Sequence, residues 1–241
     1  MWEIVISGDN EIIQELSKVF TGSEYSIEKR DGNNVLLSQQ FEKLDDYSLV
    51  KARALELLTV LNAGLVLISR PDARLSMGGV MERQENGHVI HYAEGTCTGT
   101  GSAHCTAVVI RADGMIEEAY ATDPLLKWVK IAESDDHVAR ALLLIAHDLN
   151  TWYGLYKIGE VIEEGGCTLC RRGGPLRWDF ERLKRTAQSY KLLGVDARHA
   201  SNKNDSSLQT PMPDPMTLEE AKSFILRLMQ GWLNEKLNNI S

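Results

Sequence analysis

Apolar positions in the first half of the chain switch between the two spacings that distinguish strands from helices. Alternation with a period of two indicates a strand, and apolar residues three and four positions apart indicate one face of a helix. The resulting order is strand, helix, two strands, helix and then four more strands. The sequence therefore predicts strands at residues 2–6, 25–29, 33–38, 78–83, 88–93, 107–111 and 115–120, and helices at residues 10–20 and 45–65.

Short turn signals between these strands predict antiparallel pairing. Asp31-Gly32 lies between the second and third strands, and Asn86-Gly87 and Asp113-Gly114 lie at equivalent places further along. Such pairs favour the two-residue hairpin turn, because both of its positions take a positive φ. We expect the four strands within residues 77–121 to form one antiparallel sheet that completes the N-terminal part.

The second half of the chain changes to a helical pattern after Asp123-Pro124. Thr217 and Glu220 have the spacing of a capping box, in which each side chain bonds the other residue's free backbone N–H. Three tryptophans, Trp128, Trp152 and Trp232, fall on apolar helix stripes and are expected in the core. The predicted helices cover residues 125–131, 135–148, 150–164, 179–193 and 217–237.

This order of elements predicts an α+β protein. An N-terminal α+β domain with antiparallel strands, residues 1–122, is followed by a helical bundle domain, residues 123–241. A length of 241 residues with 43% hydrophobic and 25% charged residues suits one large or two small domains.

The net charge, the apolar runs and the number of cysteines limit which partners and which cellular compartment are expected. The chain has 26 basic and 34 acidic residues, a net charge of -8, which argues against a general nucleic-acid or membrane-surface binder. It has no apolar run near the roughly 20 residues of a spanning helix, and no pattern of a signal peptide. Four cysteines are too few for a disulfide scaffold. We expect a cytoplasmic protein.

Residues 171–191 are the most basic stretch of this acidic chain. Clustered cations of this kind can hold the phosphates of a nucleotide or of RNA. Lys184, Arg185 and Gln188 are the candidate ligand-binding residues. The alternative is a solvated helix face whose arginines pair with the chain's surplus acids.

The basic stretch leads into a helix end that carries a second candidate site. Gly194 is expected to take a left-handed conformation, with Val195 turning inward and Arg198 reaching Glu160, Glu163 or Glu164. Arg198 and His199 together are the candidate catalytic pair, since a guanidinium beside an imidazole suits phosphodiester cleavage. The alternative role for both residues is to cap helix carbonyls.

Cys167 and Cys170 form a C-x-x-C motif between glycine pairs and are the candidate metal ligands. Glycines allow the backbone to curl so that both thiolates face one zinc ion. Zinc needs two further ligands, which Cys97, His104 and Cys105 could supply from the loop between strands. The alternative is a pair of free thiols in a flexible loop, so no cofactor is expected apart from this zinc.

The chain resembles a family of uncharacterised bacterial proteins of similar length. The similarity covers two segments, the opening residues, MWEIVISGD, and a C-terminal segment of the form F-K-x-T-A-N…G…A-R-H. Here that segment is residues 183–188, then Gly194, then residues 197–199. This chain departs from the pattern at Gln188, where the family has Asn, and in its cysteines. The resemblance implies no particular activity.

A more distant resemblance is to the HEPN superfamily, helical bundles found among toxins and defence ribonucleases. Its R-x4-6-H motif is matched in spacing by Arg140 and His147, whereas Arg198 and His199 are adjacent. The resemblance implies metal-independent cleavage of RNA.

Two functions are therefore expected from the sequence. The first is a binding or assembly module that recognises a protein partner or an anionic ligand through residues 177–199. The alternative is a HEPN-like ribonuclease of a toxin or defence system, with RNA as its partner.

Overall fold

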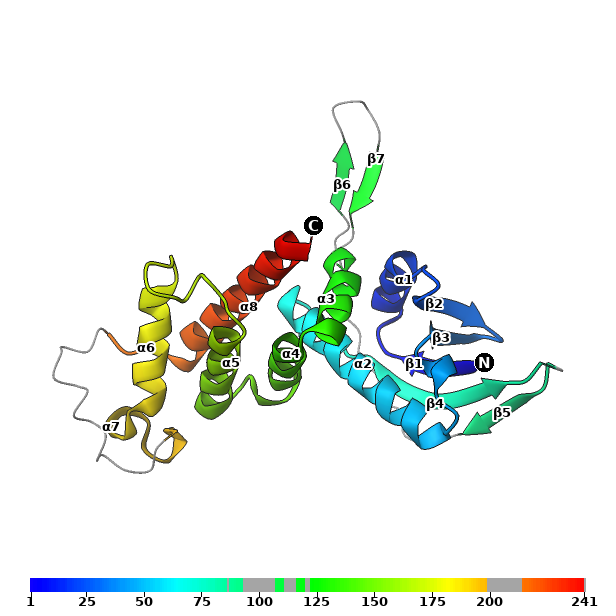
Figure 1. Cartoon of the computed structure of the whole chain (residues 1–241), viewed down its shortest axis with the longest axis horizontal. Helices are drawn as coiled ribbons and strands as arrows, with labels where there is room; N and C mark the ends of the chain where they lie inside the picture. The colour runs from blue at the N-terminus through cyan, green and yellow to red at the C-terminus, as the bar shows by residue number, and fades with distance from the viewer. Residues whose placement is uncertain (86, 93–106, 111–115, 120–121, 199–213, 241) are drawn as a thin grey trace. The chain divides into compact units, whose positions relative to one another are not determined.

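The structure is a computed structural model that describes residues 1–85, 87–92, 107–110, 116–119, 122–198 and 214–240. The chain forms two compact units, residues 1–129 and 130–241. The boundary falls within helix α3 (Asp123–Ser134), whereas the sequence divided the chain after residue 122. Each unit is described by itself. The antiparallel sheet in one and the helices in the other confirm the α+β class (Figure 1).

Unit 1 contains a five-stranded antiparallel sheet in the order β2-β3-β1-β4-β5. Its chain order, β1-α1-β2-β3-α2-β4 with β5 added, is that of the split β-α-β arrangement. This arrangement serves many unrelated functions, so it assigns none. The elements are β1 (Trp2–Ser7), α1 (Asn10–Val19), β2 (Tyr25–Arg30), β3 (Asn33–Ser38), α2 (Tyr47–Leu67), β4 (Ser76–Arg83) and β5 (Val89–Tyr92).

The predicted turn between β2 and β3 is confirmed. Asp31 has a φ of 50° and Gly32 a φ of 83°, and Arg30 pairs directly with Asn33 across the turn. A two-residue hairpin loop with both φ values positive is the turn whose twist matches that of the strands.

The prediction that the four later strands form one sheet is wrong. β4 pairs with β1, so β4 and β5 extend the first sheet. Within the described part of the chain, β6 (Ala107–Ile110) and β7 (Ile116–Ala119) pair only with each other. The reason lies in β1, where Ile4 is completely buried and faces Leu36 on one side and Val80 on the other. A strand this apolar is central to a sheet and needs a partner on both edges.

The face of the sheet that carries Ile4 forms the core of unit 1. α1 adds Ile12 and Leu16 to this core, and both side chains are completely buried. The rings of Tyr47 in α2 and Tyr92 in β5 are stacked, with their centroids 4.6 Å apart. Burying these apolar faces supplies the main stabilisation of the unit.

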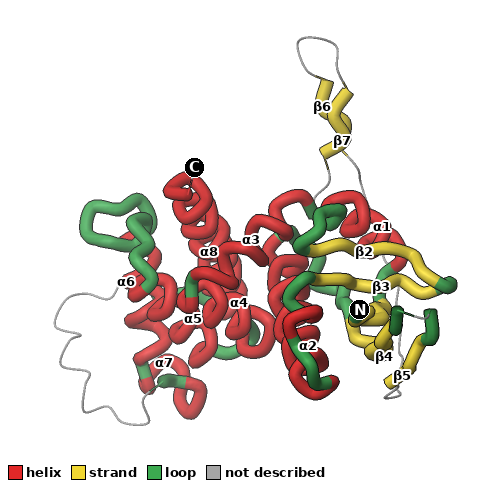
Figure 2. The backbone as a smooth tube through the Cα atoms, turned by 45° about the vertical axis from the view of Figure 1, so that its right-hand side comes forward, coloured by secondary structure: helices red, strands yellow, loops and turns green. Residues whose placement is uncertain are grey.

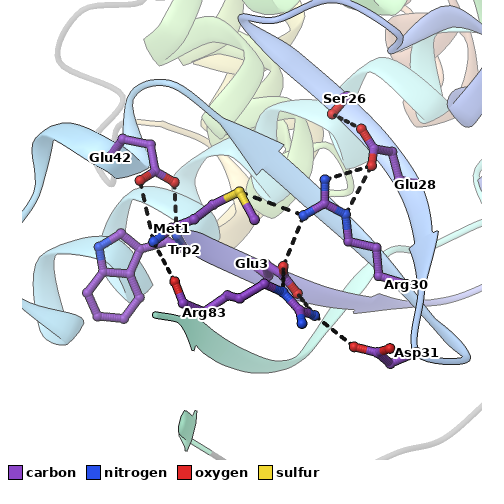
Figure 3. A network of polar contacts seen from close by, with 9 residues as sticks. All are labelled: Met1, Trp2, Glu3, Ser26, Glu28, Arg30, Asp31, Glu42 and Arg83. Atoms are coloured by element: carbon purple, nitrogen blue, oxygen red, sulfur yellow. Dashed lines mark hydrogen bonds and ion pairs between the residues drawn. The ribbon is translucent and has the colours of Figure 1, made fainter. Parts of the chain in front are cut away.

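The opposite face of the sheet carries a buried carboxylate. Glu3 alternates with Ile4 along β1, and its side chain has no exposed surface. Arg83 Nε donates to Glu3 Oε1 at 2.7 Å, and Arg30 Nη1 donates to the same oxygen at 3.0 Å (Figure 3). Burial alone would raise the pKa of Glu3, but the hydrogen bonds from Arg83 and Arg30 outweigh it and lower that pKa.

Replacing Glu3 with Gln should lower the free energy of unfolding by about 1.5–3 kcal/mol, because hydrogen bonds to a charged group are lost. Since the folded-state pKa of Glu3 lies below its unfolded value, this stabilisation is present at neutral pH and is lost as pH falls through the folded pKa. Urea unfolding at several pH values measures both effects.

Glu28→Gln is the matched control, because Glu28 also pairs with Arg30 but is well exposed. We expect it to change stability by less than about 1 kcal/mol. An equal effect of the two substitutions would contradict the role given to burial.

Among the residues of unit 2 that the structure describes, the regular elements are all helices (Figure 2). α5 packs against α4, α6 and α8, which makes it the central helix. Within the residues that the structure describes, no helix is both long and apolar enough to cross a membrane. The helices are α4 (Asp136–Asp148), α5 (Trp152–Glu164), α6 (Arg177–Gln188), α7 (Tyr190–Leu193) and α8 (Leu218–Ile240).

Close packing around α5 depends on Gly159. A Cβ atom there would lie 2.9 Å from the ring of Phe180 in α6 and 3.7 Å from Ile225 in α8. Only a residue without a side chain lets the three helices approach this closely. Trp152 and Trp232 are buried in this unit, and Trp128 in unit 1, as predicted.

The predicted capping box at the start of α8 is confirmed. Thr217 N–H donates to Glu220 Oε2 at 2.7 Å, and Glu220 N–H donates to Thr217 Oγ1 at 3.2 Å. The two side chains satisfy two backbone N–H groups that the helix leaves unpaired. The start of α8 is therefore encoded locally.

Candidate functional site

The predicted ligand-binding region meets α5 along one line of polar contacts. Tyr156, Glu160 and Glu163 are four and three residues apart and so share one face of α5. They contact Lys184 and Gln188 of α6 and Arg198 of the segment that follows. We call this set of six residues the α5–α6 seam.

The cations of α6 at this seam are neutralised by acids. Lys184 Nζ donates to Glu163 Oε2, and Arg177 Nη1 lies 3.5 Å from the other oxygen of Glu163. Arg177 also pairs with Glu181 at 2.5 Å, one turn along the same helix. This agrees with the alternative expectation, in which the basic stretch pairs with the chain's surplus acids.

Gln188 and Tyr156 form the neutral part of the seam. Gln188 Nε2 donates to the Tyr156 hydroxyl at 2.9 Å. Burial raises the pKa of Tyr156, and this hydrogen bond only partly offsets the rise. Tyr156 therefore stays protonated at neutral pH, with a hydroxyl that is already engaged.

Arg198 is anchored to the bundle by three contacts. Its Nη1 donates to Glu160 Oε1 at 3.1 Å, and its guanidinium carbon lies 4.1 Å from the centre of the Tyr156 ring. Its backbone N–H donates to Ala187 O at 2.9 Å. The prediction that Arg198 reaches an acid of α5 is confirmed, and that acid is Glu160.

The chain before Arg198 follows the prediction in one respect and departs from it in two. Gly194 has a φ of 58° and is left-handed, as expected. The predicted continuous helix instead breaks at Ser189, which has an extended conformation. Val195 was expected to turn inward, but it is 91% exposed, so that expectation is wrong. Gly194–Asp196 forms a short 3-10 turn with no buried residue, and this directs Val195 outward.

The other predicted site residues are not drawn into the seam. Arg185 is half-buried and makes no ion pair with any residue in the described ranges. His199, the second member of the candidate catalytic pair, lies outside the described residues. Arg140 donates to Glu164 at 3.3 Å, and His147 is exposed on the same helix.

The C-x-x-C motif lies in the connection between α5 and α6. Cys167 and Cys170 are both free thiols with no exposed surface. Cys97, His104 and Cys105 lie outside the described residues, and among the described ones no three candidate ligands gather into a metal site. The zinc site stays a prediction.

The sequence prediction did not single out Trp178, which lies at the start of α6. Trp178 is 65% exposed. Arg171 and Arg172, in the turn that precedes α6, are exposed as well. A signal was present, because Phe180 and Leu183 define the buried stripe of α6 and Trp178 lies two positions from it. Two positions along a helix correspond to the opposite face.

Comparison of the chain with protein-family models, with curated proteins and with solved structures finds no match.

Replacing Arg198 with Ala should lower the free energy of unfolding by about 1–2 kcal/mol, because a partly exposed ion pair and a cation–π contact are lost. Arg185→Ala is the matched control from the same basic stretch and should leave stability unchanged. Urea unfolding of the full chain measures both. Equal stability of all three proteins would contradict the anchoring of residue 198.

Proposed function

We propose that this chain is a cytoplasmic binding module whose helical unit recognises an acidic segment of a protein partner. The surface that supports this is residues 171–178, the turn before α6 together with the first two residues of that helix, which we call the recognition turn. The single observation that carries the proposal is the exposure of Trp178, 65%, in the same short segment as the exposed Arg171 and Arg172. A segment with an exposed tryptophan and two exposed arginines combines the residue types that dominate binding at protein interfaces.

The two arginines of the recognition turn differ from the cations of the seam. Lys184 and Arg198 are each held by a glutamate, whereas Arg171 and Arg172 have no ion pair within the described ranges. An unpaired guanidinium can bond a carboxylate through two parallel N–H groups. Arg185 of α6 also lacks an ion pair among the described residues but is half-buried, so the recognition turn offers the more exposed unpaired charge.

Backbone and side-chain contacts hold this turn in one conformation. Leu176 N–H donates to Leu169 O at 2.9 Å, and Gly174 N–H donates to Arg171 O at 2.8 Å. Arg177 Nη1 donates to Cys170 O at 3.2 Å, which ties the start of α6 to the same turn. A turn that is already ordered loses less conformational entropy on binding.

An acidic protein segment fits these features better than a nucleic acid does. Binding of single-stranded nucleic acid uses a groove of cations that follows several phosphates. Here two arginines and one tryptophan are exposed in one short segment, on a chain with a net charge of -8. A short segment with one or two carboxylates and an apolar side chain matches that surface.

The seam argues for binding over the ribonuclease alternative. In that alternative, Arg198 or Arg140 would have to meet a phosphate. Arg198 is bonded to Glu160 and Arg140 to Glu164, so each guanidinium already has a carboxylate partner. We therefore assign Lys184, Gln188 and Arg198 to holding α6 in place, and the partner contact to the recognition turn.

Photo-crosslinking from position 178 tests this proposal. With a photoreactive phenylalanine analogue in place of Trp178, we expect discrete protein adducts whose crosslinked peptides are rich in Asp and Glu. Reversing both charges, Arg171→Glu with Arg172→Glu, should reduce these adducts by about tenfold or more, because like charges then face each other. The adducts are quantified by mass spectrometry.

The same photoreactive residue at Tyr153 is the control, because Tyr153 is also exposed and lies on α5 of the same unit. We expect no discrete adduct there. Adducts that persist after charge reversal would overturn the proposal, and adducts removed by ribonuclease would identify RNA as the ligand instead.

A further inference from the structure

A hollow of about 490 Å³ lies between α6 and the first turns of α8, within unit 2. Asp179 and Arg182 line it from α6, and Ser223 and Arg227 line it from α8. This volume lies within the range of ligand pockets, about 300–1,000 Å³, so the hollow has room for a side chain of a partner.

The hollow adjoins the recognition turn through α6. Asp179, which lines the hollow, directly follows Trp178 in the chain, and Arg182 lies about one helical turn beyond Trp178. Residues one turn apart share a helix face, so the face of α6 that presents Trp178 continues into the hollow. A partner segment that contacts Trp178 is therefore within reach of the residues that line the hollow.

The ion pair between the two helices at this hollow is loose. Arg227 Nη2 lies 3.9 Å from Asp179 Oδ2, whereas a charge-assisted hydrogen bond measures about 2.7–2.9 Å. Arg227 is 64% exposed, and among the described residues Asp179 is its one ion-pair partner. The fork of N–H groups on Arg227 therefore stays available to a carboxylate that accepts two parallel hydrogen bonds.

Asp179 has a second cation close by. Arg182 Nη1 lies 3.6 Å from Asp179 Oδ1, on the same helix. Arg182 is itself held in place, because its Nε donates to Asp214 O at 2.9 Å. Asp179 can therefore give up Arg227 and still keep a positively charged neighbour, so the exchange leaves no carboxylate unpaired.

The two other carboxylates among the described residues that line the hollow are bonded within the chain. Glu220 Oε2 accepts the Thr217 N–H at 2.7 Å, and Glu219 pairs with Lys222 at 2.7 Å. These bonds partly offset the negative charge that an incoming carboxylate meets. Asp179 is then the acid that competes directly for Arg227.

We propose that Arg227 is a third arginine contact for the acidic partner segment, and that Asp179 occupies Arg227 until the partner binds. This inference rests on the proposed function, because it concerns the same partner. A carboxylate of the segment bonds Arg227 in place of Asp179, and Asp179 stays beside Arg182. Asp179 thus lowers the affinity for the partner, and only a segment with a carboxylate placed to reach Arg227 overcomes it.

Photo-crosslinking from the α8 side of the hollow tests whether the partner reaches it. Ser223 is exposed and lines the hollow, so we place the photoreactive phenylalanine analogue there in the full chain. We expect an adduct with the same acidic peptide that position 178 captures. The control position is Asn234, which is exposed on α8 but does not line the hollow, and it should give no such adduct.

Charge changes at the loose pair test the competition, with adducts measured from position 178. Asp179→Asn should raise the adduct yield about threefold, because an exposed ion pair no longer competes for Arg227. Arg227→Glu should lower the yield about fivefold or more, because like charges then meet. Arg140→Glu is the matched control and should leave the yield unchanged, since Arg140 is also exposed and pairs with an acid elsewhere in unit 2.

The outcomes separate this inference from the proposed function. Absence of acidic adducts at position 178 would remove both. Adducts that fall on reversal of Arg171 and Arg172, but not in Arg227→Glu, would overturn the inference alone. So would a lower yield in Asp179→Asn, which would make Asp179 a contact and not a competitor, or an adduct at Ser223 with a different protein.

Discussion

The acidic face of α5 is the feature on which the arrangement of the helical unit depends. Glu160 and Glu163 on this face receive Arg198, Lys184 and Arg177, which come from three different points of the following chain. Each pair is partly exposed and individually weak. Together with the buried contacts around Gly159, they fix α6 and the segment after it against α5.

Because of these ion pairs, only part of the basic stretch carries unpaired positive charge. By sequence, residues 171–191 form one positive cluster in an acidic chain. In the structure Lys184 and Arg177 bond Glu163 of α5, whereas Arg171 and Arg172 in the turn before α6 have no ion pair among the described residues. These two exposed arginines lie in the same short segment as the exposed Trp178, and the C-x-x-C segment that precedes the turn is held by α8. Local charge pairing, rather than total charge, decides which surface can meet a partner.

Features encoded by neighbouring residues were predictable from the sequence. Asp31-Gly32 specifies its own turn, and Thr217 with Glu220 specifies the start of α8. The sequence predicted that Arg198 bonds one of three glutamates of α5 but not which one. Chain order does not fix how packed segments are rotated against each other. The pairing of β4 with β1 joins residues at least 69 positions apart, and no local pattern encodes it. The prediction that Val195 turns inward was wrong for a different reason, because the short 3-10 turn of Gly194–Asp196 buries none of its residues.

The central claim, that α5 holds the segment ending at Arg198, is tested most directly by a double-mutant cycle. Arg198→Ala, Glu160→Gln and the double variant are compared with the unaltered chain by urea unfolding. A direct contact predicts a coupling energy of about 0.5–1 kcal/mol between the two sites. Additive effects, with coupling below about 0.3 kcal/mol, would show that the two residues act independently and would contradict the account.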